Sequence, residues 1–294
     1  MGWFHAPILA MDAGIVKPST NTLFDASVVY NGTFIRQRYP YVSAALRING
    51  FQPPPGAPVL SEGGAVNAAP NAATLPIAPG SLVSLYGAGI AATIAEASSL
   101  PLPATLANVT VYVNGFPAPL LFVSPGQINL QIPWELGIGN GTAPIAVIVS
   151  GGPYVGTRTG SPVNGTPSNI ISARVANASP GVFAIVQSSD GSLTTTNPAG
   201  VDDVLIVYAN GLGPVDSPVT TGGPPSVLTR TIETPFVTIG GVPAEVLFSG
   251  LAPGFAGLYQ MNLKVPAGVR AGSTIPLVVS TGGQTSPPYF IATR

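Results

Sequence analysis

Apolar and polar residues alternate with a period of two along several short runs of the chain, the pattern of half-buried β-strands. The clearest run is Gln-Ile-Asn-Leu-Gln-Ile-Pro at residues 127–133. We expect Ile128, Leu130 and Ile132 to face a core, and Gln127, Asn129 and Gln131 to face away from it. Pro133 ends the predicted strand, because proline cannot donate a hydrogen bond to a sheet.

The same series of strand patterns occurs twice. In the first stretch it occupies residues 82–89, 109–122, 127–133 and 145–152, and in the second residues 204–211, 237–248, 260–266 and 277–283. The dipeptides Asn114-Gly115 and Gly240-Gly241 lie at matching places between apolar runs, where they predict tight hairpin turns. Since the blocks follow one another in the same order, we interpret the chain as an internal duplication.

Two related all-β sandwich modules are therefore predicted, because 294 residues suit two domains of roughly 100–130 residues and an additional segment. We place module one at residues 67–176 and module two at residues 177–294. Residues 1–66 form a leading segment, and the Pro-, Ala- and Gly-rich stretch 52–73 is typical of a linker. The leading segment is interpreted as the tail of an upstream domain.

The composition agrees with many short strands joined by turns. Hydrophobic residues make up 46% of the chain and charged residues only 7%, and there are 36 Gly and 33 Pro. The net charge of −1, without a run of like charges, argues against nucleic acid and anionic membranes as partners. No stretch of about 18 apolar residues predicts a membrane span. Cysteine is absent, which excludes disulfides and thiolate sites.

The scarcity of Lys and Glu favours an extracellular or cell-surface location. Residues 1–12 have no basic start, and Pro7 interrupts their apolar run, so no signal peptide is recognised. If the protein is exported, we expect this chain to be a piece of a longer product or to have its true start upstream.

No catalytic site is predicted. The single histidine, His5, lies in the leading segment, and no nucleophile elbow, phosphate-binding loop or dinucleotide fingerprint is present. Asp202, Asp203 and Asp216 are weak candidates for a calcium site, with solvated loop acids as the alternative. We expect no enzymatic activity, no cofactor and no metal, and leave calcium binding open.

The polar faces of the two matching strands hold the candidate ligand-binding residues. Gln127 and Asn129 in module one correspond to Gln260 and Asn262 in module two. Side-chain amides can bond sugar hydroxyls or a partner's backbone, and Trp134 could supply an aromatic ring for stacking. The alternative is a solvated sheet face, or amides that tie a neighbouring loop to the strand.

The loop at residues 251–258 is the main difference between the repeats, and it is apolar for a loop. Leu251, Phe255 and Leu258 are its candidate interaction residues. The loop either folds over the end of its own sandwich or contacts another domain or subunit.

Four longer motifs give the chain, from about residue 66 onward, a specific family resemblance. They are Ile77-Ala-Pro-Gly-Ser-Leu-Val-Ser-Leu-Tyr-Gly87, Pro119-Leu-Leu-Phe-Val-Ser-Pro-Gly-Gln-Ile-Asn-Leu-Gln-Ile-Pro-Trp134, Tyr208-Ala-Asn-Gly-Leu-Gly-Pro-Val215 and Gly250-Leu-Ala-Pro-Gly-Phe-Ala-Gly-Leu-Tyr-Gln-Met-Asn262. The chain resembles the Solibacter uncharacterised C-terminal domain family of large exported acidobacterial proteins. The resemblance implies tandem immunoglobulin-like (IPT/TIG-like) sandwiches with an accessory role, and it supplies no catalytic residues.

Three functional hypotheses follow. The first is a non-catalytic structural, adhesion or spacer module of an exported bacterial protein. The second is a carbohydrate-binding accessory module of a secreted hydrolase, and the third is a self-assembling surface or filament subunit. The expected partners are a protein, a glycan or a second copy of the chain.

Overall fold

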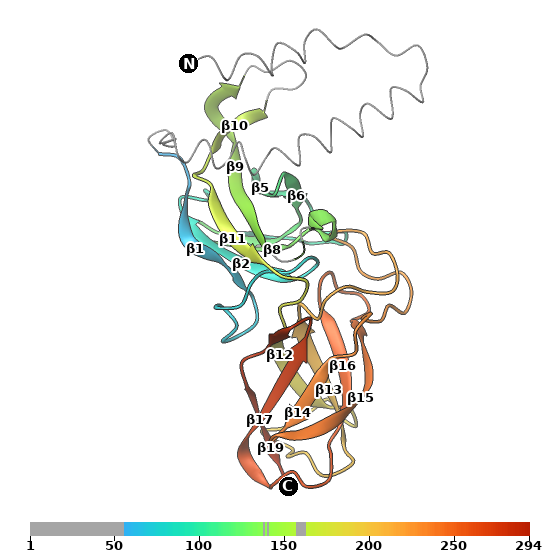
Figure 1. Ribbon diagram of the computed structural model, residues 1–294. Helices are drawn as coiled ribbons and strands as arrows, with labels where there is room; N and C mark the ends of the chain where they lie inside the picture. The colour runs from blue at the N-terminus through green and yellow to red at the C-terminus, as the bar shows by residue number, and fades with distance from the viewer. Residues whose placement is uncertain (1–55, 138, 140, 157–162) are drawn as a thin grey trace, which may run out of the picture. The chain divides into compact units, whose positions relative to one another are not determined.

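The computed structural model describes residues 56–137, 139, 141–156 and 163–294. Residues 46–294 form one compact unit, and the described part of it is built from strands, loops and one short 3₁₀ helix, η1 (Trp134–Leu136) (Figure 1). His5 and the strand-like runs predicted within residues 1–55 lie outside the described residues.

Module one contains two antiparallel sheets, whose strand orders are β1-β2-β8-β7-β3 and β10-β9-β5-β4, with β11 and β6 paired to β9 and β5. Its strands are β1 (Val59–Asn67), β2 (Leu82–Ala88), β3 (Ala95–Glu96), β4 (Thr105–Leu106), β5 (Val109–Val113), β6 (Phe116–Ala118), β7 (Leu120–Val123), β8 (Gln127–Gln131), β9 (Gly141–Gly156), β10 (Val163–Pro167) and β11 (Ile171–Val175).

Module two repeats this plan with β12-β13-β16-β15 in one sheet and β15-β14-β17 in the other, to which β18 and β19 add. Its strands are β12 (Gly181–Gln187), β13 (Val204–Asn210), β14 (Phe236–Ile239), β15 (Val242–Leu251), β16 (Tyr259–Lys264), β17 (Gly272–Thr281), β18 (Gln284–Thr285) and β19 (Tyr289–Thr293). The long strand β15 pairs with β14 through its first residues and with β16 through its last, so it links the two sheets.

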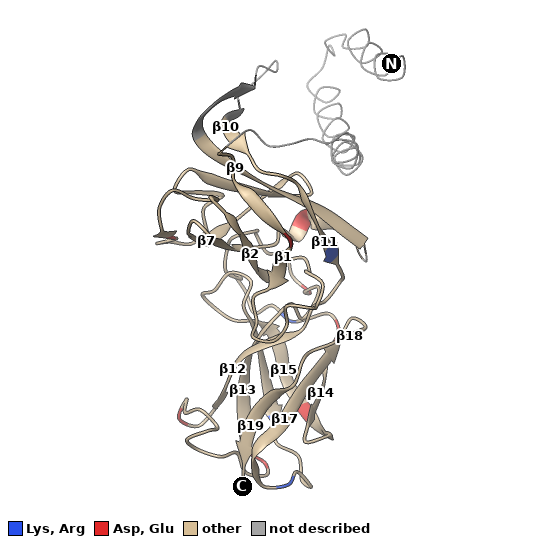
Figure 2. Cartoon of the chain, turned by 90° about the vertical axis from the view of Figure 1, so that its left-hand side faces the viewer, with Lys and Arg blue, Asp and Glu red and all other residues tan. Residues whose placement is uncertain are grey.

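Both modules have the strand order of an immunoglobulin-like sandwich. The main strands of each module can be lettered A to G in chain order, leaving out the short strands β3, β4 and β6 and the additions β10 and β18. The first sheets, β1-β2-β8-β7 and β12-β13-β16-β15, then both have the order A-B-E-D. The second sheets, β5-β9-β11 and β14-β17-β19, both have the order C-F-G. The prediction of two tandem immunoglobulin-like β-sandwiches is thereby confirmed. Few residues of either module are charged (Figure 2).

The duplication extends to single hydrogen bonds. Ser168 donates its backbone N–H to the Val147 carbonyl and accepts the Val147 N–H on its hydroxyl, and Ser286 makes the same two bonds with Val279. The register between the D and E strands also shifts at matching places, once before Phe122 and once before Phe248. Repeats that share such irregular details descend from one folding unit.

The alternating residues form the two cores, as predicted. In module one Leu85, Val111 and Ile128 are fully buried. In module two Val207 and Met261 occupy matching places in a separate core. Because the side chains of a strand alternate between its faces, the same alternation turns Gln127 and Gln260 away from the cores.

The first strand of module one begins earlier than the sequence predicted. Strand β1 pairs with β2, yet it lies within the stretch assigned to the leading segment and linker. The register shifts between Leu60 and Ala65, and Gly63 adopts a positive φ of 70°. This irregularity interrupts the period of two, which is why the composition of a linker was the stronger signal there.

Tyr259 ties the core of module two to a neighbouring loop. Its side chain is fully buried, and its hydroxyl donates a 2.6 Å hydrogen bond to the Gly213 carbonyl. Burial raises the pKa of Tyr259 well above its ordinary value, so the phenol stays protonated and remains a donor.

Replacing Tyr259 by Phe should destabilise module two, because the buried Gly213 carbonyl loses its donor. We expect the unfolding free energy to fall by about 1 kcal/mol, measured by urea denaturation followed by circular dichroism. Tyr289→Phe is the control, since Tyr289 is only partly buried beside the same core. Equal losses in the two variants would refute a specific role for the Tyr259 hydroxyl.

Candidate binding surfaces and the module junction

The four candidate amides lie on the outer faces of two equivalent strands. In β8, Gln127 Nε2 donates to Asn129 Oδ1 at 2.8 Å, and in β16, Gln260 Nε2 donates to Asn262 Oδ1 at 2.9 Å. All four side chains are half-buried. The structure therefore brings the predicted residues together as two matching pairs, one on each module.

Each amide pair is flanked by two aromatic residues. Tyr86 lies opposite Gln127, and Phe122 lies opposite Asn129, so their side chains share one face of the sheet. We call the four residues amide face one. The corresponding pairings in module two define amide face two, which consists of Tyr208, Phe248, Gln260 and Asn262.

The borders of the two amide faces differ in charge, and the border of face two includes Lys264 with Glu245 opposite it. Glu96 lies opposite Phe122, at the border of amide face one. At amide face two, the guanidinium carbon of Arg230 lies 5.0 Å from the centroid of the Phe248 ring. What the faces share is therefore their uncharged amides and rings.

Trp134 is separate from the amides. It lies in η1, and its indole packs against the core of module two. A Cβ atom added to Gly80 would come within 2.3 Å of the indole, so only glycine allows this close contact. Trp134 Nε1 is buried without a hydrogen-bond partner among the described residues. The structure thus places the predicted stacking residue at the contact between the modules.

The apolar loop of module two lies at the same contact. A Cβ atom added to Gly257 would approach the Gly80 carbonyl to 2.8 Å and the Leu82 side chain to 2.9 Å. Leu251 is buried and Leu258 half-buried, whereas Phe255 is 56% exposed. Of the three predicted interaction residues, only Phe255 offers most of its side chain to an external partner.

Buried amides join the two modules, and we call this contact the junction. Asn210 Oδ1 accepts the Leu82 N–H at 2.8 Å, and Asn210 Nδ2 donates to the Leu82 carbonyl at 2.7 Å and to Asn67 Oδ1 at 2.8 Å. Asn67 Nδ2 in turn donates to the backbone carbonyl and the hydroxyl of Ser179. The Asn210 side chain thus pairs with Leu82 as another strand would.

A second set of bonds closes the other side of the junction. Gln131, which is fully buried, donates to the Gly80 carbonyl at 3.2 Å and accepts the Gly222 N–H at 2.7 Å. The Thr221 hydroxyl accepts the backbone N–H of Trp134 at 3.0 Å and donates to the Glu135 carboxylate at 2.7 Å. Apart from Trp134 Nε1, the buried polar groups named here find partners at the contact, so the junction favours one arrangement of its residues.

The sequence interpretation missed Asn67 and Asn210, and it placed Gln131 on the outer face of its strand, whereas Gln131 is fully buried at the junction. A signal was nevertheless present, because two of them lie where the repeats differ. Asn210 corresponds to Ala88, and Gln131 corresponds to Lys264. At positions of a duplicated fold that serve only one module, the two copies need not agree.

The far end of module two carries charges at the positions that form the junction in module one. Gly80 and Asp202 both have a left-handed backbone, and their N–H groups donate to Ile132 and Val265 in turn. Asp202, however, pairs with Lys264 at 2.8 Å. The equivalent ends of the two modules thus differ. In module one this end forms an apolar and amide contact, and in module two it is an ionic surface.

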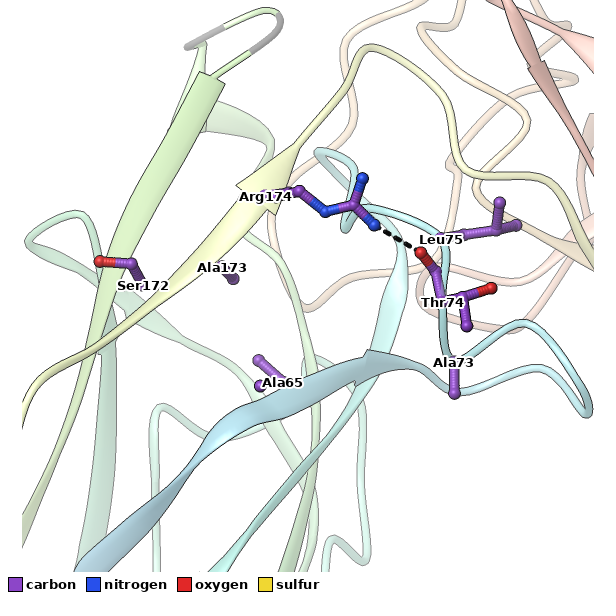
Figure 3. A pocket seen from close by; sticks show the side chains of 8 residues that line it. Ala65, Ala73, Thr74, Leu75, Ser172, Ala173 and Arg174 are labelled. Atoms are coloured by element: carbon purple, nitrogen blue, oxygen red, sulfur yellow. Dashed lines mark hydrogen bonds between the residues drawn. The ribbon is translucent and has the colours of Figure 1, made fainter.

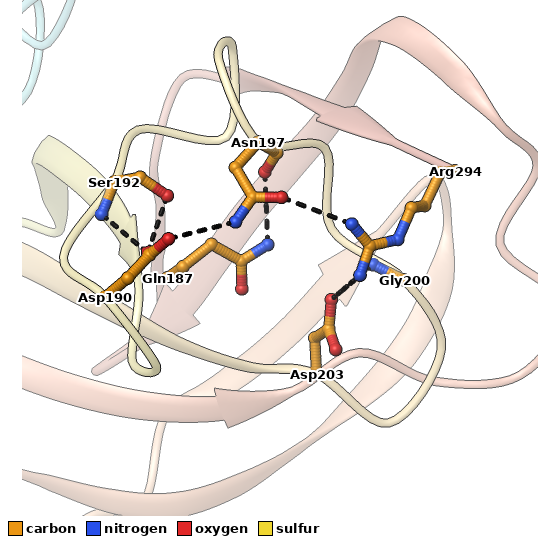
Figure 4. A network of polar contacts seen from close by, with 7 residues as sticks. All are labelled: Gln187, Asp190, Ser192, Asn197, Gly200, Asp203 and Arg294. Atoms are coloured by element: carbon orange, nitrogen blue, oxygen red, sulfur yellow. Dashed lines mark hydrogen bonds and ion pairs between the residues drawn. The ribbon is translucent and has the colours of Figure 1, made fainter.

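A network of polar contacts continues this ionic surface (Figure 4). Arg294 pairs with Asp203 at 3.2 Å and donates to Asn197, which in turn donates to Asp190. Asp216, the third calcium candidate, instead accepts the backbone N–H of Arg230. Among the described residues, no three acidic or histidine side chains gather in a way that could hold a metal ion.

A cavity of about 300 Å³ lies beside β1 and β11 in module one. Arg174 is its charged lining residue, and its guanidinium donates to the Thr74 carbonyl (Figure 3). Small and apolar residues, Ala65, Ala73, Leu75 and Ala173, form much of the remaining wall. None of the residues of the amide faces lines the cavity.

No model of a known protein family and no curated protein matches the chain. Several solved structures show weak similarity. The BSP domain of a biofilm-associated protein is 16% identical, with a TM-score of 0.23, and the match covers 74% of this chain and 29% of that one. The I9–I11 tandem of titin is 8% identical, with a TM-score of 0.20 and coverages of 81% and 66%.

Two further structures are similar to the same extent. The C-terminal domain of Streptococcus agalactiae AgI/II polypeptide BspA is 10% identical, with a TM-score of 0.19, and the match covers 81% of this chain and 99% of that one. The extracellular region of plexin A4 is 10% identical, with a TM-score of 0.24, and the chain spans 18% of it. The fold assignment rests on the strand order of the modules.

Within the described residues, no helix is long and apolar enough to span a membrane.

Replacing Asn210 by Ala should weaken the junction. Both backbone polar groups of Leu82 and the Asn67 side chain would lose a buried partner, so we expect a loss of about 2–3 kcal/mol in unfolding free energy. Urea denaturation of the full chain measures it. Asn177→Ala, at an exposed position between the modules, is the control. If the two variants are equally stable, the junction does not depend on the Asn210 amide.

The pKa of Asp190 provides a local test of the ionic surface. The Ser192 hydroxyl and then the Ser192 backbone N–H hydrogen-bond this carboxylate and lower its pKa below 3.8. A lowered pKa stabilises the folded state above pH 3.8, and this contribution is lost as the pH falls through the folded-state pKa.

We therefore expect Ser192→Ala to shift the Asp190 titration midpoint upward, as followed by NMR of the carboxyl carbon. Ser189→Ala, in the same exposed turn, should leave the midpoint unchanged. A midpoint that is insensitive to Ser192 would contradict the assignment.

Proposed function

We propose that this chain is a non-catalytic structural module of an exported bacterial protein, in which two immunoglobulin-like sandwiches act as one rigid spacer. Adhesion is the biological setting that we propose for it, at the cell surface or outside the cell. Membership of the acidobacterial family named above is part of the same proposal.

The junction is the observation that carries this proposal. The linker between β11, which ends at Val175, and β12, which begins at Gly181, is short. Across it, Asn67, Gln131 and Asn210 have almost no exposed surface, and each bonds a group of the other module. A flexible tether between independent domains would leave such amides in water. Their burial supports a rigid element that holds the two modules at a set distance from each other.

The chemistry of the chain supports a structural role over a catalytic one. The most deeply buried polar side chains of the described residues lie at the junction or bond backbone groups within the modules. The two ion pairs lie at the surface, where such pairs contribute little to stability. The buried polar groups thus hold the backbone and the junction in place.

Rigidity can be measured directly, because the chain contains no cysteine. Cysteines introduced for spin labels at Ala104 and Thr274, which are exposed in modules one and two, would report the distance between the modules. We expect one narrow distance distribution by pulsed electron paramagnetic resonance. Gln131→Ala combined with Trp134→Ala should broaden it, because both sides of the junction lose contacts.

The control is Gln284→Ala, in β18, because Gln284 makes none of the junction bonds described above. A broad distribution in the unsubstituted chain would show that the modules move independently and would rule out a rigid spacer.

A further inference from the structure

We propose that amide face one and amide face two are equivalent binding sites for a neutral linear polysaccharide. This inference goes beyond the structural role, because a rigid spacer needs no ligand. It rests on three properties of the faces. Their amides bond no backbone group, aromatic rings lie beside them, and the same arrangement occurs in both modules.

The outer-face amides differ from five other buried or half-buried amides of the chain, which bond backbone groups. Asn169 bonds the Leu60 backbone on both its amide atoms, and Gln187 bonds the Asn197 carbonyl. Asn67, Gln131 and Asn210 likewise bond backbone groups. These amides have a structural function that is visible in their partners.

The amides of the two faces instead bond side chains alone. Gln127 bonds Asn129, which also accepts the Ser84 hydroxyl, and Gln260 bonds Asn262. Tying a loop to the strand, the alternative considered from the sequence, is thus not what the described bonds show. Each pair keeps an amide NH₂ on the asparagine and a carbonyl oxygen on the glutamine for an external partner.

The aromatic residues supply the other half of a sugar-binding surface. A pyranose ring offers C–H groups that pack on an aromatic face and hydroxyls that both donate and accept hydrogen bonds. Tyr86, which is 42% exposed, lies beside Gln127, and Tyr208 lies beside Gln260 in the same way. An amide donor, an amide acceptor and a ring thus lie side by side on a sheet, which suits an extended chain of sugars.

Charge selects a neutral ligand. None of the eight residues of the two faces is charged, whereas Glu96 borders the first face, and Arg230 borders the second together with Lys264 and the Glu245 opposite it. An anionic polymer would be repelled at the first border, and the second border holds charges of both signs, with the two cations Arg230 and Lys264 in excess over Glu245. A neutral polymer meets the same chemistry on both modules.

The duplication points to a ligand that itself repeats. Tyr, Phe, Gln and Asn are the same in both faces, although the junction residues Gln131 and Asn210 differ from their counterparts. Two equal sites on one chain can bind one polymer together, which strengthens retention well beyond that of a single site.

The test is a depletion assay with insoluble neutral polysaccharides, including cellulose, chitin, xylan and mannan, and the full chain. We expect retention on at least one of them. Gln127→Ala with Asn129→Ala, and separately Gln260→Ala with Asn262→Ala, should each weaken binding by about tenfold or more through the loss of bivalency. The variant with all four substitutions should lose binding.

The matched control is Gln284→Ala with Asn177→Ala, which removes the same side-chain types outside both faces and should bind as the unsubstituted chain does. Asn129→Ser with Asn262→Ser is a milder second set, and thermal melts confirm that each variant is folded. Three results would overturn the proposal: no retention on any of the polysaccharides, retention that the four substitutions leave unchanged, or self-association that they abolish. None of these results would alter the distances that test the rigid spacer.

Discussion

The pairing of the Asn210 side chain with the backbone of Leu82 is the contact on which the relation between the two modules depends. An amide matches the donor and acceptor spacing of a peptide group, so one side chain can satisfy both polar groups of a strand residue. Buried in this way, the contact is directional as well as attractive. Trp134 and the loop around Gly257 add packing, but packing alone would allow neighbouring arrangements.

The sequence was sufficient for the architecture. The alternation around Ile128 and its counterpart Met261 predicted the strands, and the matching order of blocks predicted two modules of one fold. The Asn114-Gly115 and Gly240-Gly241 turns have the positive φ angles that their residues favour. These features are local, and local patterns can be read without coordinates.

The junction could not be predicted in the same way, because the hydrogen bonds between its two modules join residues more than 80 positions apart. Trp134 shows the difficulty: an aromatic residue after a polar strand resembles an exposed platform, and only the approach of module two and the small size of Gly80 turn it inward. Strand β1 was missed for another reason, since its register shift hides the alternation. Comparing the repeats for differences as well as similarities would have exposed Asn210.

The left-handed backbone position shared by Gly80 and Asp202 shows how one fold can have two kinds of end. At Gly80 the absence of a side chain leaves room for the Trp134 indole, and this end of module one packs against module two. At Asp202 a carboxylate and its lysine partner remain hydrated, so a sandwich that docked there in the manner of module two would have to strip water from both charges. The cost of dehydration therefore makes the two equivalent ends different: the end at Gly80 packs against protein, and the end at Asp202 faces solvent.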